Sequence, residues 1–271
     1  MKWYIIILYK MENERIAITL GDAGENHAGM EMIGIRGDMG TGFTSENLLI
    51  IQSKLSKYET EFINLSNYID ESVDDASVLV IRNYIPSSKQ NIIYNELTSF
   101  EWDTKYFDTR RQKVLNKHAR SNVILVDNVS KEPDYENGSG TIIDASTLPT
   151  FYKYKNKLTK LINKTVKDKQ TDYIAEGNRY YNLNKCGIGF HGDTERTKVI
   201  CMSIGADDYL LRWCWFYQSR PVSKPIDVKL NSGDVYIMSE KAVGNDWKRR
   251  SIYTLRHSAG CDKYTSLKKY D

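Results

Sequence analysis

Histidine and cysteine are scarce in this chain, which has four of each among its 271 residues. The cysteines stand far apart, and no two have the Cys-x-x-Cys spacing of a structural zinc site. Isolated cysteines also give no disulfide framework, so we expect a reducing, intracellular compartment, the cytoplasm or the nucleus. Any metal or acid–base site built on histidine must draw on His27, His118, His191 and His257.

Long hydrophobic runs and a strong excess of one charge are missing too. The apolar run Trp3–Tyr9 is far shorter than the roughly 18 residues that span a membrane, and it lacks the small-residue cleavage site of a secretory signal. A mean hydropathy of −0.53 with 27% charged residues is typical of a soluble globular protein. The net charge of +3 is too small to indicate a nucleic-acid binder by itself. The abundance of lysine, asparagine, isoleucine and tyrosine fits an AT-rich genome such as that of a virus.

Glycine is concentrated between residues 21 and 42. This stretch has neither the Gly-x-x-x-x-Gly-Lys-Ser/Thr pattern nor a Gly-x-Gly-x-x-Gly between a strand and a helix. We therefore interpret it as a series of tight turns and not as a phosphate-binding loop.

Hydrophobic periodicity in the first 170 residues predicts both strands and helices. Arg15–Leu20 and Ser77–Tyr84 have the composition of strands. Ser45–Lys57 and the amphipathic stretch Phe151–Val166 repeat apolar residues at helical intervals. We expect these helices to support a sheet formed mainly by the rest of the chain.

After residue 171 the pattern changes to short β-rich runs separated by turn residues. These runs are Lys198–Ile204, Tyr209–Phe216, Ile226–Leu230, Asp234–Met238 and Ser251–Arg256. Their spacing predicts an α+β protein in which residues 171–271 form a sandwich or jelly-roll core, buttressed by a mixed region of residues 1–170. Trp213 and Trp215 alternate on one run and are expected in its core, with base stacking as the alternative.

The stretch from Lys105 to Arg120 carries six basic residues against one acidic residue and is interleaved with aromatic side chains. Such a stretch suits a nucleic-acid backbone and an unstacked base, and it suits a solvated helix face equally well. In the nucleic-acid interpretation, the phosphate-binding residues are Arg110, Arg111, Lys113, Lys117 and Arg120. The lysine-rich face of the Phe151–Val166 helix would add to this contact.

His191-Gly192-Asp193 places an imidazole and a carboxylate two residues apart. In an extended segment such residues point to the same face, so both can converge on one ion. A non-haem iron(II) site of the facial type needs a second histidine and keeps other coordination positions open. We expect His257 to supply it, because it ends a predicted strand that follows the Gly233-Asp234 turn. The alternative is that these histidines form ordinary hydrogen bonds.

Around this motif the chain resembles the AlkB-like iron(II)/2-oxoglutarate dioxygenases. That family shows an Asn-Arg-Tyr element, a glycine-containing lead into a His-x-Asp motif, and a strand that ends in Ser-x-Gly. The matching segments here are Asn178-Arg179-Tyr180, residues 187–196 (GIGFHGDTER), Ser203-Ile204-Gly205-Ala206 and Leu210-Leu211-Arg212. The resemblance covers about residues 178–269 and implies a double-stranded β-helix, which is a jelly roll.

The resemblance implies that His191, Asp193 and His257 bind Fe(II), with 2-oxoglutarate as cosubstrate and O2 as oxidant. It also implies that residues near the Asn-Arg-Tyr element contact the cosubstrate. The residues at the matching positions are Asn178, Tyr180 and Tyr181.

In the family, the distal carboxylate of 2-oxoglutarate is bound by two arginines that lie six residues apart after the second histidine. This sequence departs from that pattern. After His257 the only basic residues are lysines, of which Lys263 and Lys269 keep this spacing. Arg250 and Arg256 keep it as well, but they precede His257. We prefer His257 as metal ligand with Lys263 or Lys269 at the cosubstrate. In the alternative register Arg250 and Arg256 bind the cosubstrate, and the second histidine has been lost.

The activity that the resemblance implies is oxidative demethylation or hydroxylation of a nucleic-acid base, as in DNA repair, with the base swung out of its stack. A prolyl-type protein hydroxylase of the same superfamily is the enzymatic alternative. A non-catalytic β-fold binding module is the alternative from another class. The residues favour neither DNA nor RNA.

Overall fold

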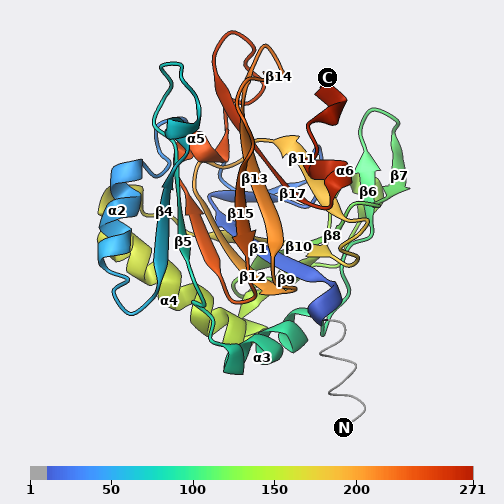
Figure 1. Ribbon diagram of the computed structural model, residues 1–271. Helices are drawn as coiled ribbons and strands as arrows, with labels where there is room; N and C mark the ends of the chain where they lie inside the picture. The colour runs from blue at the N-terminus through green and yellow to red at the C-terminus, as the bar shows by residue number, and fades with distance from the viewer. Residues whose placement is uncertain (1–10, 271) are drawn as a thin grey trace.

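The computed structural model describes residues 11–270, so the apolar run Trp3–Tyr9 lies outside the described residues. The strands form two larger sheets and two hairpins, accompanied by helices (Figure 1). The fold class is therefore α+β, as predicted. No helix in residues 11–270 combines the length and the apolar character that crossing a membrane requires.

The larger sheet has eight strands in the order β4-β5-β16-β12-β1-β10-β8-β9. In that order they are Thr60–Asn64, Ser77–Ile81, Val235–Met238, Val199–Gly205, Arg15–Gly21, Ile174–Tyr180, Ser121–Val126 and Ile142–Asp144. Neighbouring strands are antiparallel except β8 and β9, which run parallel. The N-terminal strand β1 lies in the middle, between β12 and β10.

This sheet joins the two regions that the sequence suggests. Strands β1, β4, β5, β8 and β9 come from residues 1–170, whereas β10, β12 and β16 come from residues 171–271. The predicted boundary at residue 170 therefore crosses the sheet. The N-terminal region contributes strands to the sheet itself, in addition to the helices that were expected to buttress it.

The smaller sheet comes entirely from the C-terminal region. Its strands are β11 (Gly187–His191), β17 (Thr254–Gly260), β13 (Tyr209–Tyr217) and β14 (Arg220–Pro221), and β15 (Ile226–Leu230) also pairs with β13. The predicted runs at residues 198–204, 209–216, 226–230 and 234–238 agree with β12, β13, β15 and β16 to within a residue. The last predicted run begins three residues too early, because β17 starts only at Thr254.

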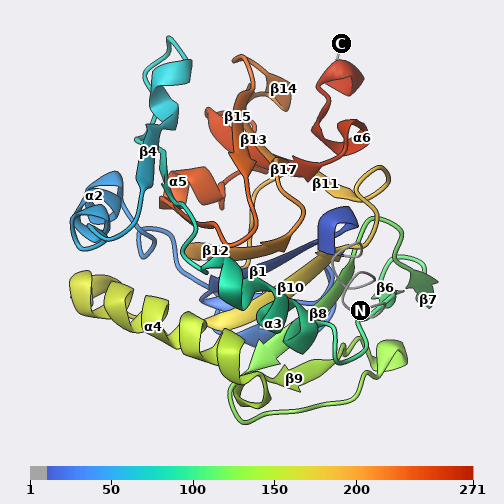
Figure 2. The same ribbon diagram turned by 60° about the horizontal axis from the view of Figure 1, so that its bottom comes forward.

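The two sheets pack face to face (Figure 2) through a buried apolar cluster to which both contribute. Trp213 and Trp215 are fully buried in it, which confirms their predicted place in the core. Their indole N–H groups donate to the carbonyl oxygens of Ala242 and Leu65 at 3.1 and 3.0 Å. Both large rings thus bury their surface without leaving a polar atom unpaired.

Three helices cover the other face of the larger sheet (Figure 2). They are α2 (Ser45–Ser53), α3 (Ser87–Leu97) and α4 (Pro149–Thr165). Leu48, Ile93 and Leu158 from these helices share a buried cluster with Ile16 and Ile18 of β1. The two predicted helices are confirmed, although α2 ends four residues before the predicted end. Because side chains alternate along β1, its other face is left to meet the smaller sheet.

The remaining elements are short. Two hairpins are formed by β2 (Ala23–Glu25) with β3 (Met32–Gly34) and by β6 (Lys105–Asp108) with β7 (Lys113–Asn116). Short helices are α5 (Glu240–Val243), α6 (Asp262–Thr265), η1 (Leu65–Tyr68), η2 (Tyr135–Asn137), η3 (Ala145–Thr147), η4 (Lys167–Lys169) and η5 (Lys268–Tyr270). The basic stretch Lys105–Arg120 is therefore a hairpin with a following loop, and not a helix face.

Candidate metal centre

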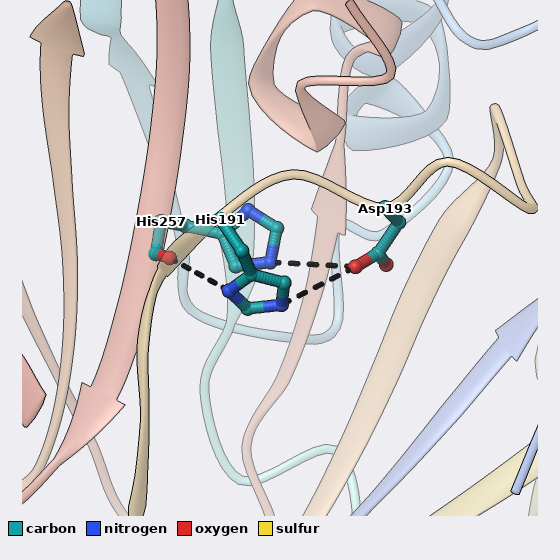
Figure 3. A group of neighbouring side chains, drawn as sticks. All are labelled: His191, Asp193 and His257. Carbon is teal, nitrogen blue, oxygen red and sulfur yellow. Dashed lines mark hydrogen bonds and ion pairs between the residues drawn. The ribbon is translucent and has the colours of Figure 1, made fainter. Parts of the chain in front are cut away.

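His191 and His257 are directly paired residues of the neighbouring strands β11 and β17, so their side chains can stand close together on one face of the smaller sheet. Oδ1 of Asp193 lies 3.5 Å from Nε2 of His191 and 3.8 Å from Nε2 of His257 (Figure 3). The three potential ligand atoms all lie within 4.8 Å of one another. The structure thus brings together the three residues that the sequence suggests as one metal site.

Gly192, between two of these residues, is set against the backbone of a neighbouring turn. A Cβ at this position would lie 2.0 Å from the carbonyl oxygen of Gly244, which follows α5. Next to it, the N–H of Asp193 donates to the carbonyl oxygen of Val243 at 3.1 Å. The glycine therefore lets the chain leaving β11 pass close to the end of α5, and this contact sets the position of Asp193.

Burial and neighbouring charges shift the pKa values of His257 and Asp193, and hydrogen bonds orient His191. Burial and the nearby His191 lower the pKa of His257 to about 3, so its imidazole is neutral at pH 7. Nδ1 of His191 lies 2.8 Å from the carbonyl oxygen of Gly189 and 3.0 Å from that of His257, which favours a proton on Nδ1 and a lone pair on Nε2. Burial alone would raise the pKa of Asp193, but Arg196 and the histidines hold it well below its ordinary value. Neutral imidazole and carboxylate are the forms that bind metals.

Arg196 holds the aspartate in place. Its side chain is 3% exposed, and its Nε lies 3.5 Å from Oδ2 of Asp193. Its Nη2 donates to Glu195 at 2.6 Å and also to Glu176. Three carboxylates therefore surround one guanidinium, so the positive charge of Arg196 is more than balanced within the protein.

The three side chains open into a cavity of about 350 Å³, a size in the range of small-molecule sites. The larger sheet contributes Ala17, Thr19, Glu176, Asn178, Tyr180, Val199, Tyr236 and Met238 to its wall, and the smaller sheet contributes Ile188, His191, Leu211, His257 and Ala259. The β2 strand adds Glu25, and connecting segments add His27, Ala28, Arg120, Gly192, Asp193, Thr194, Glu195, Arg196, Trp247 and Lys248. The cavity thus lies between the sheets and has both apolar and charged walls.

Two of the predicted cosubstrate residues, Asn178 and Tyr180, line this cavity. Tyr181 does not; it is 45% exposed, and its hydroxyl donates to the carbonyl oxygen of His118 at 3.2 Å. The reason is the alternation of side chains at the end of β10, which turns adjacent residues to opposite sides.

The three basic residues predicted to bind the cosubstrate are not among the residues that line the cavity in the described chain. Lys263 and Lys269 are exposed beyond β17, near the rings of their neighbours Tyr264 and Tyr270. The guanidinium of Arg256 lies 4.3 Å from the ring centroid of Phe216 and 5.3 Å from that of Trp247. Since it adjoins His257 along an extended strand, its side chain points to the opposite face.

The basic residues predicted to bind phosphates are divided between three environments. Arg110, Arg111 and Lys113 are exposed at the tip of the β6–β7 hairpin. The Nζ of Lys117 instead donates to the backbone carbonyl oxygen of Asn26 at 3.1 Å, and burial lowers its pKa to about 7. Arg120 lines the cavity. Only the first group is therefore exposed, and within it Arg111 pairs with Asp108 at 3.3 Å.

The cavity residues that were not identified from the sequence include His27, Glu176 and Trp247. The His27 ring stacks on Tyr106 of β6 with centroids 3.7 Å apart, and burial lowers the pKa of His27 to about 4. Glu176 could have been found, because alternation along a strand places it on the same face as Asn178. Nothing in the local pattern places His27 or Trp247 near the triad.

Comparison with known proteins gives one relative and no activity. No protein-family model matches the chain. The chain is 39% identical over 261 residues to "Uncharacterized protein R156" of Acanthamoeba polyphaga mimivirus, and the match covers 93% of this chain and 97% of that protein. The similarity therefore extends over most of the chain and is not confined to one segment of it.

Proposed function

We propose a function from the geometry of the candidate metal centre. The chain belongs to the same family as the mimivirus protein, but the name of that protein states no activity. The proposal is an Fe(II)- and 2-oxoglutarate-dependent dioxygenase of the AlkB-like type that demethylates or hydroxylates a nucleic-acid base. One observation carries it: two imidazoles and a carboxylate converge within 4.8 Å in the wall of a cavity.

The donor set suits Fe(II). Metal–ligand bonds of about 2 Å place neighbouring donor atoms roughly 3–4 Å apart, and the two Nε2–Oδ1 distances are 3.5 and 3.8 Å. Two histidines and one carboxylate leave further coordination positions for other ligands, which is the arrangement of non-haem iron(II) oxygenases. The pair of sheets that encloses the site supports a jelly-roll interpretation of the fold, which forms part of this proposal.

With Fe(II), 2-oxoglutarate and O2 bound, such a site supplies the oxidation of a substrate C–H bond coupled to the conversion of 2-oxoglutarate into succinate and CO2. The protein's own residues would position the reactants. His191, Asp193 and His257 would hold the metal, and Arg196 would keep the carboxylate ionised and oriented. Apolar walls from Ile188 and Leu211 limit the access of water.

The β6–β7 hairpin supports a nucleic-acid substrate. Its exposed tip carries Arg110, Arg111 and Lys113, and its Tyr106 stacks on the cavity residue His27. Phosphates bound at the tip would place a nucleic acid beside the cavity, which a flipped base could then enter. The lysines of α4 are not part of this surface, because α4 packs on the face of the larger sheet opposite to the cavity.

An anaerobic titration tests the proposed chemistry. Fe(II) and then 2-oxoglutarate are added to the purified protein, and the weak visible charge-transfer band of the complex is recorded. The wild type should develop the band, and His191→Ala should abolish it because one metal ligand is lost. His118→Ala, which removes an exposed imidazole outside the cavity, is the matched control and should leave the band unchanged. A wild type without iron binding would refute the oxygenase and favour a binding module.

The salt dependence of oligonucleotide binding tests the proposed substrate. Each phosphate neutralised on a single strand contributes about −0.7 to the slope of log K against log salt concentration. Replacing Arg110, Arg111 and Lys113 together with glutamine should therefore make the slope shallower by about 2. A flat slope for the wild type, with DNA and with RNA, would contradict the phosphate contacts and favour a protein hydroxylase.

A further inference from the structure

The proposed function requires a cation for the distal carboxylate of 2-oxoglutarate. Three side chains with a permanent positive charge line the cavity: Arg120, Arg196 and Lys248. Arg196 already has three carboxylates around it, so another anion there would meet an excess of negative charge. Lys248 is exposed, and its ammonium lies over the ring of its neighbour Trp247 at 5.6 Å. Neither offers a free, positioned cation inside the cavity.

Arg120 differs because it forms no ion pair with any residue in the described part of the chain. Its Nε donates to Oδ1 of Asn178 at 2.5 Å, and the same oxygen accepts a hydrogen bond from Nδ2 of Asn122 at 2.6 Å. Nδ2 of Asn178 donates in turn to Glu176 at 3.1 Å. These bonds hold the guanidinium by its Nε and leave its two Nη groups, whose geometry suits a carboxylate, for a ligand.

The titratable groups next to Arg120 do not neutralise its positive charge. Tyr180 interacts electrostatically with both Arg120 and Asp193. Burial raises the pKa of Tyr180 to about 12, so its phenol is neutral at pH 7. Glu176, the acid next along the hydrogen-bond chain, is bonded to Arg196. A partly buried cation without a counter-ion is unfavourable, and a carboxylate entering the cavity would relieve this.

We propose that Arg120, positioned by Asn178, binds the distal carboxylate of 2-oxoglutarate in place of the lysines that follow β17. This inference rests on the proposed function, since it assumes a 2-oxo acid at the metal. Arg120 lies in the loop directly before β8, which is a strand of the larger sheet. The metal ligands instead belong to the smaller sheet and to the loop that follows β11. The cosubstrate would bridge the two sheets across the cavity.

Two ligands separate this role from a general structural one: 2-oxoglutarate, and pyruvate, which has the same 2-oxo acid group but no distal carboxylate. Their dissociation constants from the Fe(II)-loaded protein are measured anaerobically from the charge-transfer band, without turnover. The wild type should bind 2-oxoglutarate about 10- to 100-fold more tightly than pyruvate, the range expected for a charge-assisted contact. Arg120→Gln should lose this preference and keep the affinity for pyruvate, and Arg120→Lys should retain part of it.

The controls distinguish this inference from the proposed function. Arg110→Gln removes an exposed arginine of the hairpin and should change neither constant. Retention of the preference in Arg120→Gln, or its loss in Lys263→Gln or Lys269→Gln, would overturn the inference and leave the dioxygenase intact. An equal loss of affinity for both acids in Arg120→Gln and Arg120→Lys would also overturn it, since that indicates a structural role. A wild type that binds Fe(II) but neither acid would refute the proposed function as well.

Discussion

Removal of Arg196 should destabilise the protein strongly, because it leaves three neighbouring carboxylates without their common cation. The side chain of Arg196 is 3% exposed, and those of Glu176, Asp193 and Glu195 are 9%, 14% and 17% exposed. Breaking a buried ion pair by removing one partner costs about 3–5 kcal/mol, since the remaining charge stays in a poorly solvated place. With three carboxylates affected, we expect Arg196→Gln to fall in the upper part of that range.

Urea denaturation of the metal-free protein measures this loss. The matched control is Arg212→Gln, because Arg212 forms a two-bond pair with Asp227 in which the side chains are 21% and 43% exposed. A pair with that exposure contributes about 0.2–1 kcal/mol. Fe(II) should restore part of the stability of Arg196→Gln, since a divalent cation next to Asp193 replaces some of the missing charge. A loss no larger than that of the control would refute the role assigned to Arg196.

Three further predictions concern the same region. Gly192→Ala should weaken Fe(II) binding about 10- to 100-fold by displacing Asp193. The control Gly189→Ala, whose Cβ would meet no atom closer than 3.5 Å, should bind Fe(II) normally. Equal Fe(II) affinities of the two variants in a metal titration would contradict this prediction. Burial alone would raise the pKa of Asp22, but Lys198 and backbone N–H groups lower it. The ionised carboxylate of Asp22 therefore contributes fully to the stability of the folded protein above the ordinary pKa of 3.8. This contribution is lost as the pH falls through the lower pKa of the folded state. Asp22→Asn should therefore flatten the acid side of the stability curve measured in urea, and an unchanged curve would argue against it. Fe(II) at 100 times its Kd should raise the free energy of unfolding of the wild type by about 2.7 kcal/mol, and a similar rise in Asp193→Ala would place the metal elsewhere.

The convergence of His191, Asp193 and His257 could be predicted from the sequence because few alternatives existed. With four histidines in the chain, only His257 combined a late position with a β-rich setting, and the period of two in a strand placed His191 and Asp193 on one face. Trp213 and Trp215 were predictable for the same reason, since alternate large apolar residues on a strand usually face the core.

The cation that we propose for the cosubstrate, Arg120, could not be predicted in this way. The spacing of Lys263 and Lys269 suggests a late strand, but the chain after β17 forms the short helices α6 and η5 instead of another strand. Arg120 was counted with its basic neighbours, because charge density along the sequence does not show which side chains turn inward. Only the pairing of β8 with β10, which places Asn122 opposite Asn178, brings Arg120 to the cavity.

Because synthesis proceeds from the N-terminus, β1 leaves the ribosome long before its two partners, β10 and β12, which lie far later in the sequence. Until those partners have been made, its backbone N–H and C=O groups have no neighbouring strand, a state that favours association with other chains. The sheet can be completed only when this distant pairing closes, which predicts slow refolding. A fragment made of residues 171–271 would lack β1, the strand that joins β10 to β12, so the residues that these two strands contribute to the cavity wall would lose their support.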